Sequence, residues 1–594
     1  MHLASLNALP DEILQIVLFQ LSPQDTVLNV QRVSKRFWRL GNEPLLWRYH
    51  CRVQFRYWDV KHRIRQKFLG SVGDVDWKML YIHRKKVDTQ TTEILDSILE
   101  DQANRIKKFN SIGEFGYDAK DTLLRHCRAN ETAEDVLARR YYATAVLDYV
   151  HRSEALAEWS RLAKGENVSL ERALGSFDLF VLHDNYGDLL EIGDLFDKLV
   201  KRLCNERPNL DQMSSRGQAF AVATFLRMHN LTGLDSESAY RDLQNNYIGI
   251  ALQDIHHPSL PLISVSIFCG LACRLGLDAR CCGMPNHVHA MVFPESTQDR
   301  NSANAVGSDP IYLDPYRTDE EIPAVHLLEM LASWGIEPAN FSRFIGDSST
   351  ASLVLRSSRS ILATVHEFRE QGANPNSHPT IRLYANPFAD MDNAFYSALW
   401  ANYMLTDVVS GPNLSSQRQF IPMILERFER LYPMDASLIE QYICPLYNNP
   451  SNAEHWELHE ALRVVKAADQ SPKQLKPRNT RSSRENVRYQ VGQVFRHKRY
   501  NYIAVITGWD IECGMNSDWM AHNQVHSLSK GRFQSFYHSL VEDTSIRYVA
   551  EENIEIIRPE YPRSLMTLAG RFFKRWDKEK RLFVSNIRDE YPDD

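Results

Sequence analysis

The sequence predicts a multidomain α+β protein, with a helical N-terminal unit, a mainly helical middle region that contains a small sheet, and a small C-terminal β-barrel. Three observations lead to this prediction. The chain has 594 residues, which is more than one hydrophobic core usually organises. Apolar residues recur at helical spacing over most of the first 468 residues. Between residues 490 and 509, and again between 537 and 557, they alternate with polar residues, as half-buried strands require.

Composition is that of an ordinary protein of an aqueous compartment. Hydrophobic residues make up 43% and charged residues 24%, and the net charge of -6 gives no sign of a polyanionic partner for the whole molecule. The sequence shows no signal peptide and no run of about 18 apolar residues, so we expect a cytoplasmic or nuclear protein without a membrane span. Nine cysteines without a CxxC pair favour reduced, buried thiols, and we expect neither a metal nor a cofactor.

Residues 9–50 are expected to form a group of short helices. Pro10 stands at a helix start, and the acids that follow it lie in the first turn, where the helix dipole favours them. Apolar residues then recur at helical spacing, and these are Ile13, Val17, Leu18 and Leu21. Such a small unit buries too little surface to be very stable alone, so its apolar residues favour a partner.

This N-terminal unit, residues 1–50, resembles an F-box. The resemblance rests on Leu9-Pro10-Asp11-Glu12-Ile13, Val17-Leu18, Leu21, Asp25, Val33-Ser34-Lys35-Arg36-Phe37 and Leu46-Trp47. In F-box families the partner is the Skp adaptor of a ubiquitin ligase built on a cullin scaffold, and the resemblance implies both partners. It also implies a Skp-binding surface, whose expected members are Leu9, Pro10, Ile13, Leu18 and Val33. The alternative is a helical cap on the next domain.

Residues 51–165 are predicted to be a helical connector, and helical spacing continues through most of residues 166–467. Residues 260–277 form an apolar run that ends near a glycine, which fits a buried helix with a Gly cap. Three runs are predicted to be strands, and these are 279–283, 288–293 and 311–313. Residues 294–310 are polar and contain no aromatic residue, so we expect a disordered insertion between strands.

The middle region, residues 166–467, resembles the SirB-type transglutaminase-like family. The matching residues are Leu170-Glu171-Arg172-Ala173-Leu174, Asn245-Asn246-Tyr247, Leu260-Pro261-Leu262-Ile263-Ser264, Arg274-Leu275-Gly276-Leu277, Pro285-Asn286-His287-Val288-His289 and Leu313-Asp314-Pro315. Catalytic members use a Cys at a helix start, a His that takes its proton and an Asp that orients the His. The resemblance implies residual counterparts at Ser264, His289 (or His287) and Asp314.

The nucleophile of this family is missing from its expected place. No cysteine lies between His256 and Phe268, and Cys269 falls within an apolar run, where a thiol packs and stays inert. We therefore expect no catalytic residue and a scaffold used for binding. The alternative is a transglutaminase-like hydrolase. His287 and His289 share a face if they lie on one strand, where they would line a cleft or form a solvated edge.

The C-terminal part is predicted to consist of a linker at residues 468–487, a strand-rich domain at 488–560 and a charged tail at 561–594. The linker is rich in Ser, Pro, Asn and basic residues, and residues 473–500 carry nine Lys or Arg against one acid. Within the domain, strand alternation predicts that one of the adjacent residues Phe536 and Tyr537 faces the core and the other a partner groove.

The strand-rich domain resembles the YccV/HspQ-like family. The matching residues are Tyr489-Gln490-Val491-Gly492-Gln493-Val494, Arg496-His497-Lys498-Arg499-Tyr500, Val505-Ile506, Gly508-Trp509-Asp510, Gln534-Ser535-Phe536-Tyr537 and Tyr548-Val549-Ala550-Glu551-Glu552-Asn553. The family is named for hemimethylated-DNA binding and includes adaptors for proteolysis, so the resemblance implies a DNA or a protein partner. We expect a partner surface formed by Arg496, Lys498, Arg499, Trp509 and Tyr537.

The three resemblances occur in an order similar to that of F-box-only proteins. They imply a substrate-recognition subunit of an SCF-type (Skp–cullin–F-box) E3 ubiquitin ligase. Such a subunit recruits a protein substrate, here of unknown identity, through its middle and C-terminal domains. It acts as a non-catalytic adaptor that raises the effective concentration of substrate near the ubiquitin donor. The alternatives are a hydrolase in the middle domain and DNA binding by the YccV-like domain.

Overall fold

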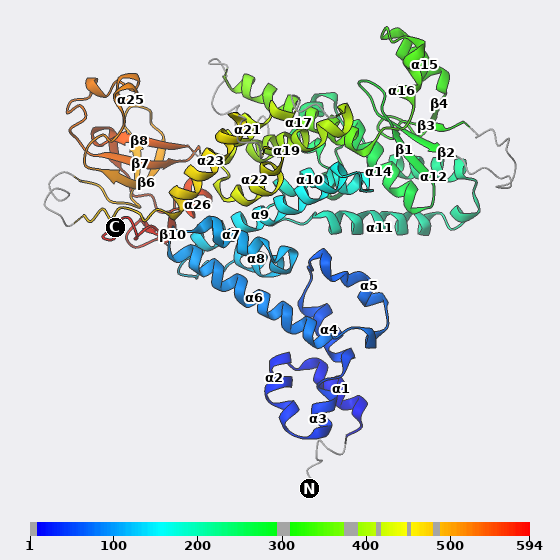
Figure 1. Ribbon diagram of the computed structural model, residues 1–594, viewed down its shortest axis with the longest axis horizontal. Coiled ribbons are helices and arrows are strands. Elements are labelled where there is room, and N and C mark those ends of the chain that lie inside the picture. The colour runs from blue at the N-terminus through cyan, green and yellow to red at the C-terminus, as the bar shows by residue number, and fades with distance from the viewer. Residues whose placement is uncertain are drawn as a thin grey trace. The chain divides into compact units, whose positions relative to one another are not determined.

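The computed structural model describes residues 9–293, 309–373, 390–411, 417–447, 453–478, 487–543 and 545–594. The chain forms two compact units, which are Met1–Val150 with Met434–Asp594 and His151–Pro433 (Figure 1). The predicted multidomain α+β class is confirmed, since helices predominate and the sheets are small and antiparallel. None of the described helices is long and apolar enough to cross a membrane.

The first unit begins with the short helices that the sequence predicts. They are α1 (Asp11–Gln20), α2 (Pro23–Leu28), α3 (Lys35–Leu40) and α4 (Pro44–Gln54). The Ser22 hydroxyl caps α2 by accepting a hydrogen bond from the backbone N–H of Asp25, and Ser34 caps α3 in the same way. The helices enclose a small core, whose buried members are Leu14, Leu18, Phe37, Leu40 and Leu46.

The predicted connector is helical. Its helices are α5 (Ile64–Leu69), α6 (Trp77–Glu100), α7 (Arg105–Gly113), α8 (Lys120–Cys127) and α9 (Val136–Ala163). Helix α6 packs against α4, where Trp47 and Trp77 lie in one buried cluster. The fully buried Arg84 on α6 forms an ion pair with Asp121, with 3.0 Å between Nη2 and Oδ2. A buried guanidinium requires such a partner.

The second unit is mainly helical around a four-stranded sheet. Its first helices are α10 (Leu170–Val181), α11 (Leu189–Glu206), α12 (Ser215–Met228), α13 (Ile248–Gln253) and α14 (Pro261–Arg274). Helix α14 is the predicted apolar helix, and it is buried on nearly every side. It ends where Gly276 adopts the left-handed backbone conformation with φ of 87°, and the N–H of Leu277 bonds to the carbonyl of Ala272.

The sheet packs against α14 and has the strand order β1-β2-β3-β4. Its strands are β1 (Asp278–Cys282), β2 (His289–Phe293), β3 (Ile311–Leu313) and β4 (Glu321–Ile322). The three predicted strands are thus confirmed, and β4 was not predicted. Most of the predicted insertion, residues 294–308, lies outside the described residues. The later helices are α15 (Ala324–Ser333), α16 (Phe341–Ile345), α17 (Thr350–Ala373), α19 (Met391–Ser410) and α21 (Ile421–Arg430), and α17 packs along α19 (Figure 1).

The first unit resumes with α22 (Ala436–Tyr442) and α23 (Ala453–Gln470), followed by the strand-rich part. Five antiparallel strands pair in the order β8-β7-β6-β5-β9. They are β5 (Val494–His497), β6 (Ile503–Asp510), β7 (Phe536–Val541), β8 (Ile546–Ala550) and β9 (Ile554–Ile556). Helix α25 (Ser517–His522) lies in the connection between β6 and β7.

The prediction of a charged tail at residues 561–594 is wrong. This segment forms helix α26 (Arg563–Ala569) and the hairpin of β10 (Phe573–Asp577) and β11 (Leu582–Ser585). Strand β10 carries charged residues between its aromatic ones, and the buried Phe573 and Phe583 belong to the same core as strands β5 to β7. The segment is therefore part of the folded C-terminal domain.

Segments far apart in the sequence meet within the first unit. The Gln102 side-chain amide donates a hydrogen bond to the Asp589 carboxylate, with 2.8 Å between the atoms. The Asp469 carboxylate accepts hydrogen bonds from the backbone N–H groups of Arg105 and Ile106. The first unit is therefore completed only by residues that follow the second unit in the sequence.

Candidate functional sites

The N-terminal helices leave many apolar side chains in solvent. The exposed ones are Ile13, Ile16, Val17, Leu28, Val33, Trp38, Leu45, Tyr49 and Val53. On α1, Ile13, Ile16 and Val17 lie on one helical face, since they are three and four residues apart. Exposed apolar side chains gathered on one small unit are typical of a protein-binding surface.

The five residues expected to bind the Skp adaptor lie in three kinds of environment. Pro10, Ile13 and Val33 are exposed, and Leu9 is half-buried against the small helical core. Leu18 is only 2% exposed, which corrects its assignment to the surface. It lies on the inner face of α1 with Leu14, so it stabilises the fold of the unit.

A buried His–Asp pair lies beside the sheet of the second unit. His287 Nε2 is 2.9 Å from Asp314 Oδ2, and both side chains are buried. Burial by itself would raise the pKa of Asp314, but the hydrogen bond and the charge of His287 outweigh it, and the pKa lies below its ordinary value. The sequence prediction of His289 as the residual histidine is therefore corrected to His287.

His289 stands next to this pair, with 4.9 Å between the two imidazole centroids. Burial, followed by the charge of His287, lowers the pKa of His289 to about 4, so its ring is neutral at physiological pH. Its Nδ1 atom is buried and has no hydrogen-bond partner among the described residues. His289 is thus a buried neutral neighbour of the His–Asp pair.

The two residues that the sequence offers as nucleophiles, Ser264 and Cys269, have hydrogen-bond partners other than the His–Asp pair. Ser264 lies fully buried in the first turn of α14, 2.8 Å from the Ser259 hydroxyl, and accepts a hydrogen bond from the backbone N–H of Gly233. Cys269 Sγ lies 3.9 Å from Cys281 Sγ, and this contact together with burial raises the pKa of Cys269 well above its ordinary value. Among the described residues, no hydrogen bond joins either side chain to the His–Asp pair.

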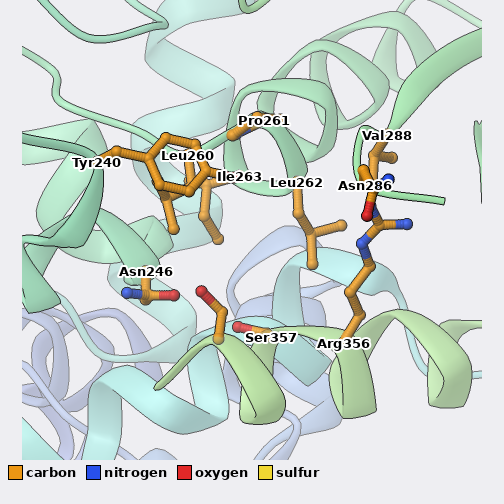
Figure 2. Close-up of a pocket in the computed structure, with 11 residues that line it drawn as sticks. Tyr240, Asn246, Leu260, Pro261, Leu262, Ile263, Asn286, Val288, Arg356 and Ser357 are labelled. Carbon is orange, nitrogen blue, oxygen red and sulfur yellow. The ribbon is translucent and has the colours of Figure 1, made fainter. Parts of the chain in front are cut away.

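A small cavity lies at the N-terminal end of α14 (Figure 2). Its volume is about 80 Å³. It is lined by Tyr240, Asn246, Leu260, Pro261, Leu262, Ile263, Asn286, Val288, Arg356, Ser357 and Ser360. Arg356 extends from α17 towards Asn286 and Val288, which flank His287 in the sequence. The cavity therefore combines one cation with several neutral polar groups and an apolar wall.

Within the described part of the chain, two groups of side chains have the spacing of metal ligands. They are His62 with His83 and Asp118, and His287 with His289 and Asp314. Asp118 already faces Arg84, with 3.5 Å between Oδ1 and Nε, and Lys61. The charges of Arg317 and Arg356 act on His289 in the second group. Because cations oppose the approach of a divalent ion, we assign no metal ligand to either group.

The C-terminal residues expected to bind a partner separate into an exposed and a buried group. Arg496, Lys498 and Arg499 are exposed at the end of β5 and in the following turn. Trp509 is 2% exposed and Tyr537 is fully buried, which corrects both assignments. The indole N–H of Trp509 donates to the Asp594 carboxylate at 2.9 Å, so the segment predicted to be a tail covers this face.

Phe536 and Tyr537 point to opposite faces of β7, as the alternation predicts, but both faces are covered. Tyr537 belongs to the main core of the domain, and Phe536 packs in a second cluster with Met520 of α25. The exposed aromatic residues that sequence reasoning missed include Tyr500 and Phe533, each close to the guanidinium of the preceding arginine. No local pattern distinguishes them from core aromatics.

Three family models match the chain, in separate segments. The model described as F-box-like matches residues 6–53. The transglutaminase-like superfamily matches residues 191–358, and the model described as hemimethylated DNA-binding protein YccV like matches residues 487–580. No solved structure matches the chain significantly.

The curated relatives are similar over nearly their whole length. F-box only protein 21 of Pongo abelii is 22% identical, with 100% of this chain and 92% of the relative covered. The proteins of the same name from Mus musculus and Homo sapiens are also 22% identical, with 99% and 100% of this chain and 92% of each relative covered. The chain carries these three domains in this order and is homologous to F-box only protein 21. This relationship supports a substrate-recognition role of the F-box type.

The matched segments place the described sites in named domains. The F-box-like segment contains the exposed apolar residues of α1 to α4. The transglutaminase-like segment runs from α11 into α17 and contains the His–Asp pair and every residue that lines the cavity except Ser360. The YccV-like segment ends at residue 580, beyond the predicted boundary at 560, and includes α26 and β10. The finer SirB-type assignment stays a prediction.

Proposed function

We propose that this protein is the substrate-recognition subunit of an SCF-type E3 ubiquitin ligase. Its F-box-like domain binds the Skp adaptor and, through it, the cullin scaffold, while the transglutaminase-like and YccV-like domains bind a protein substrate. The proposal is carried by the apolar residues that the F-box-like helices leave in solvent, since Val33 is 67% exposed and Ile16 58%. Burying one such side chain in an interface contributes roughly 1.5–3 kcal/mol.

The same proposal assigns a binding role to the middle domain. It is supported by the hydrogen bonds of Ser264 and Cys269, which lead away from the His–Asp pair. A substrate receptor performs no bond chemistry, because its contribution is to hold substrate lysines near the charged ubiquitin carrier. The protein is then a non-catalytic adaptor, and the ubiquitin transfer takes place on its partners.

The adaptor role predicts that acids on the exposed F-box face prevent assembly. Replacing Ile13 and Val33 together by Asp should weaken binding of the Skp adaptor by roughly a hundredfold or more, because two apolar contacts are lost and two charges are desolvated. Affinity purification of the full chain from cells, followed by detection of the Skp adaptor and the cullin, measures the effect. Both residues are exposed, so the fold should remain intact.

The matched control is Leu69→Asp, an equally drastic change at a residue that is 89% exposed and lies outside the F-box-like segment. This variant should recover the adaptor and the cullin as well as the wild type does. Equal recovery by the Ile13 and Val33 variant would contradict the proposed function.

The YccV-like domain gives DNA binding as a second candidate function, favoured by the description of the matching family and by the exposed cations Arg496, Lys498 and Arg499. Three cations that neutralise three phosphates would lose about 40-fold in affinity between 50 and 200 mM salt. We expect the full chain to bind duplex DNA weakly, with no preference for hemimethylated sites. Fluorescence anisotropy at several salt concentrations tests this, and submicromolar, methylation-dependent binding at physiological salt would refute it.

A further inference from the structure

Arg356 is a half-buried cation without an acidic partner among the described residues. Its Nη1 donates a hydrogen bond to the backbone carbonyl of Met284 at 2.6 Å, and no carboxylate of the described residues forms an ion pair with it. Burial lowers the pKa of Arg356 below its ordinary value, although the guanidinium stays charged. A desolvated charge without a counterion is costly, and such groups in proteins are usually paired.

The cavity beside Arg356 is lined by further polar side chains (Figure 2), and among them the Asn246 amide nitrogen donates a hydrogen bond to the Leu243 carbonyl at 3.2 Å. The side-chain amides of Asn246 and Asn286 line it from two sides, and the hydroxyls of Ser357 and Ser360 line it from α17. The first turn of α14 closes the cavity. Pro261 has no N–H, and the backbone N–H groups of Leu262 and Ile263 have no acceptor within their own helix. The cavity therefore has the polarity of an anion site.

The size and the charge of the cavity restrict the anion. A volume of about 80 Å³ accommodates a single small group. One guanidinium matches one negative charge and presents two parallel N–H groups to a carboxylate, whereas a phosphate group carries about two charges near neutral pH. The wall formed by Leu260, Leu262 and Val288 suits the aliphatic carbons next to a carboxylate.

We propose that this cavity binds a carboxylate group of the protein substrate, with Arg356 as its cationic anchor. The group is either the C-terminal carboxylate of a peptide or an Asp or Glu side chain. The inference rests on the proposed function, because it names the chemistry by which a substrate receptor recognises its substrate. The cavity then contributes specificity, and the remainder of the interface lies on other surfaces.

Three peptide libraries of random neutral hexamers test the proposal with the full-length protein. One has a free C-terminal carboxylate, one is amidated and contains a single Glu, and one is amidated without an acid. The wild type should retain one of the two carboxylate-bearing libraries at least tenfold better than the neutral library, as expected for hydrogen bonds to a charged group. Equal retention of all three libraries would overturn the proposal.

Matched substitutions on α17 connect the binding to the cavity. Arg356→Gln should reduce retention of the carboxylate library about tenfold or more. Arg359→Gln removes an exposed arginine three residues further along the same helix and should change retention less than threefold. An equal loss in both variants would show attraction by general charge and overturn the assignment.

A second variant gives a result even if Arg356→Gln folds poorly. Ser360 lies four residues after Arg356 on α17 and also lines the cavity, so Ser360→Asp supplies a carboxylate to the guanidinium from within the chain. This variant should lose the peptide binding and melt at a higher temperature than the wild type. Unchanged peptide retention would contradict the proposal.

Recovery of the Skp adaptor, measured on the same samples, separates this proposal from the proposed function. The Arg356 and Ser360 variants should bind the adaptor as the wild type does, because the F-box-like segment is unchanged. Loss of carboxylate selectivity with intact adaptor binding supports the cavity as the recognition site. A wild-type protein that binds the adaptor but shows no carboxylate selectivity overturns the further inference alone.

Discussion

Replacing Phe583 by Ala should lower the free energy of unfolding of the C-terminal domain by about 3–5 kcal/mol. Phe583 is fully buried on β11, and its ring centroid lies 5.1 Å from that of Phe573 and 4.8 Å from that of Trp576. These rings share one core with strands β5 to β7, so the loss of packing caused by the substitution should destabilise the whole domain. Urea-dependent hydrogen exchange of the amides in β6 and β7, followed by mass spectrometry, measures the loss.

The control is Phe533→Ala, which removes the same ring from a site that is 77% exposed. This change should alter the free energy of unfolding by no more than about 0.5 kcal/mol. If Phe583→Ala left the protection of β6 and β7 unchanged, the hairpin would be an appendage instead of part of the core.

Raising the pH from 5 to 8 should destabilise the second unit of the wild type by about 4 kcal/mol relative to its Asp178→Asn variant. Asp178 is 2% exposed, and burial raises its pKa to about 8 although the N–H groups of Gly249 and Ile250 bond to its carboxylate. The unfolded chain has a carboxyl pKa of about 3.9. The native state therefore binds the extra proton between about pH 4 and pH 8.

The sign of the effect follows from this difference. A pKa that is higher in the folded state contributes stability that is complete below about pH 4 and is lost as the pH rises towards 8. Asn has nearly the same shape as protonated Asp, so the two proteins should have similar stability near pH 4. Urea-dependent hydrogen exchange of α13 at several pH values measures the difference. Asp211→Asn changes an exposed carboxylate and should follow the wild type, and parallel profiles for the wild type and Asp178→Asn would contradict the prediction.

Periodicity predicted most elements but not the last hairpin. The apolar helix and the three strands of the middle region were predicted to within a few residues, because each shows its period in a run of consecutive positions. The final hairpin has two strands of four or five residues, in which Phe573 and Trp576 are separated by Lys574 and Arg575. A β-bulge between Phe573 and Arg575 shifts the register, so β10 does not show the period of two that would predict a strand.

Site residues were harder to predict, because burial depends on segments that are distant in the sequence. Alternation correctly placed Phe536 and Tyr537 on opposite faces of a strand, but it carries no information about which faces other segments cover. Trp509 is covered by Tyr591, which lies 82 residues later, with 5.6 Å between the ring centroids. Likewise, two histidines two residues apart were equivalent in the sequence, and only the position of Asp314 distinguishes them.

The cavity beside Arg356 was even harder to predict from the sequence. Arg356 is one of several arginines on α17, and helical spacing alone does not separate it from the exposed Arg359. Its special environment arises because α14, the segment before β2 and α17 meet at one point. A local sequence pattern cannot predict that these three segments pack together.

The discontinuous first unit sets the order in which this protein can fold during synthesis. Residues 1–150 leave the ribosome long before the residues that complete their unit. The hydrogen bond of Gln102 to Asp589 and that of Arg105 to Asp469 cannot form until those later residues have been synthesised. The continuous unit, residues 151–433, can fold as soon as it has emerged. The early helices therefore remain without their final contacts throughout most of translation. Chaperones should bind the early helices most strongly during this interval. A truncating mutation before residue 434 leaves the F-box-like domain attached to an incomplete unit.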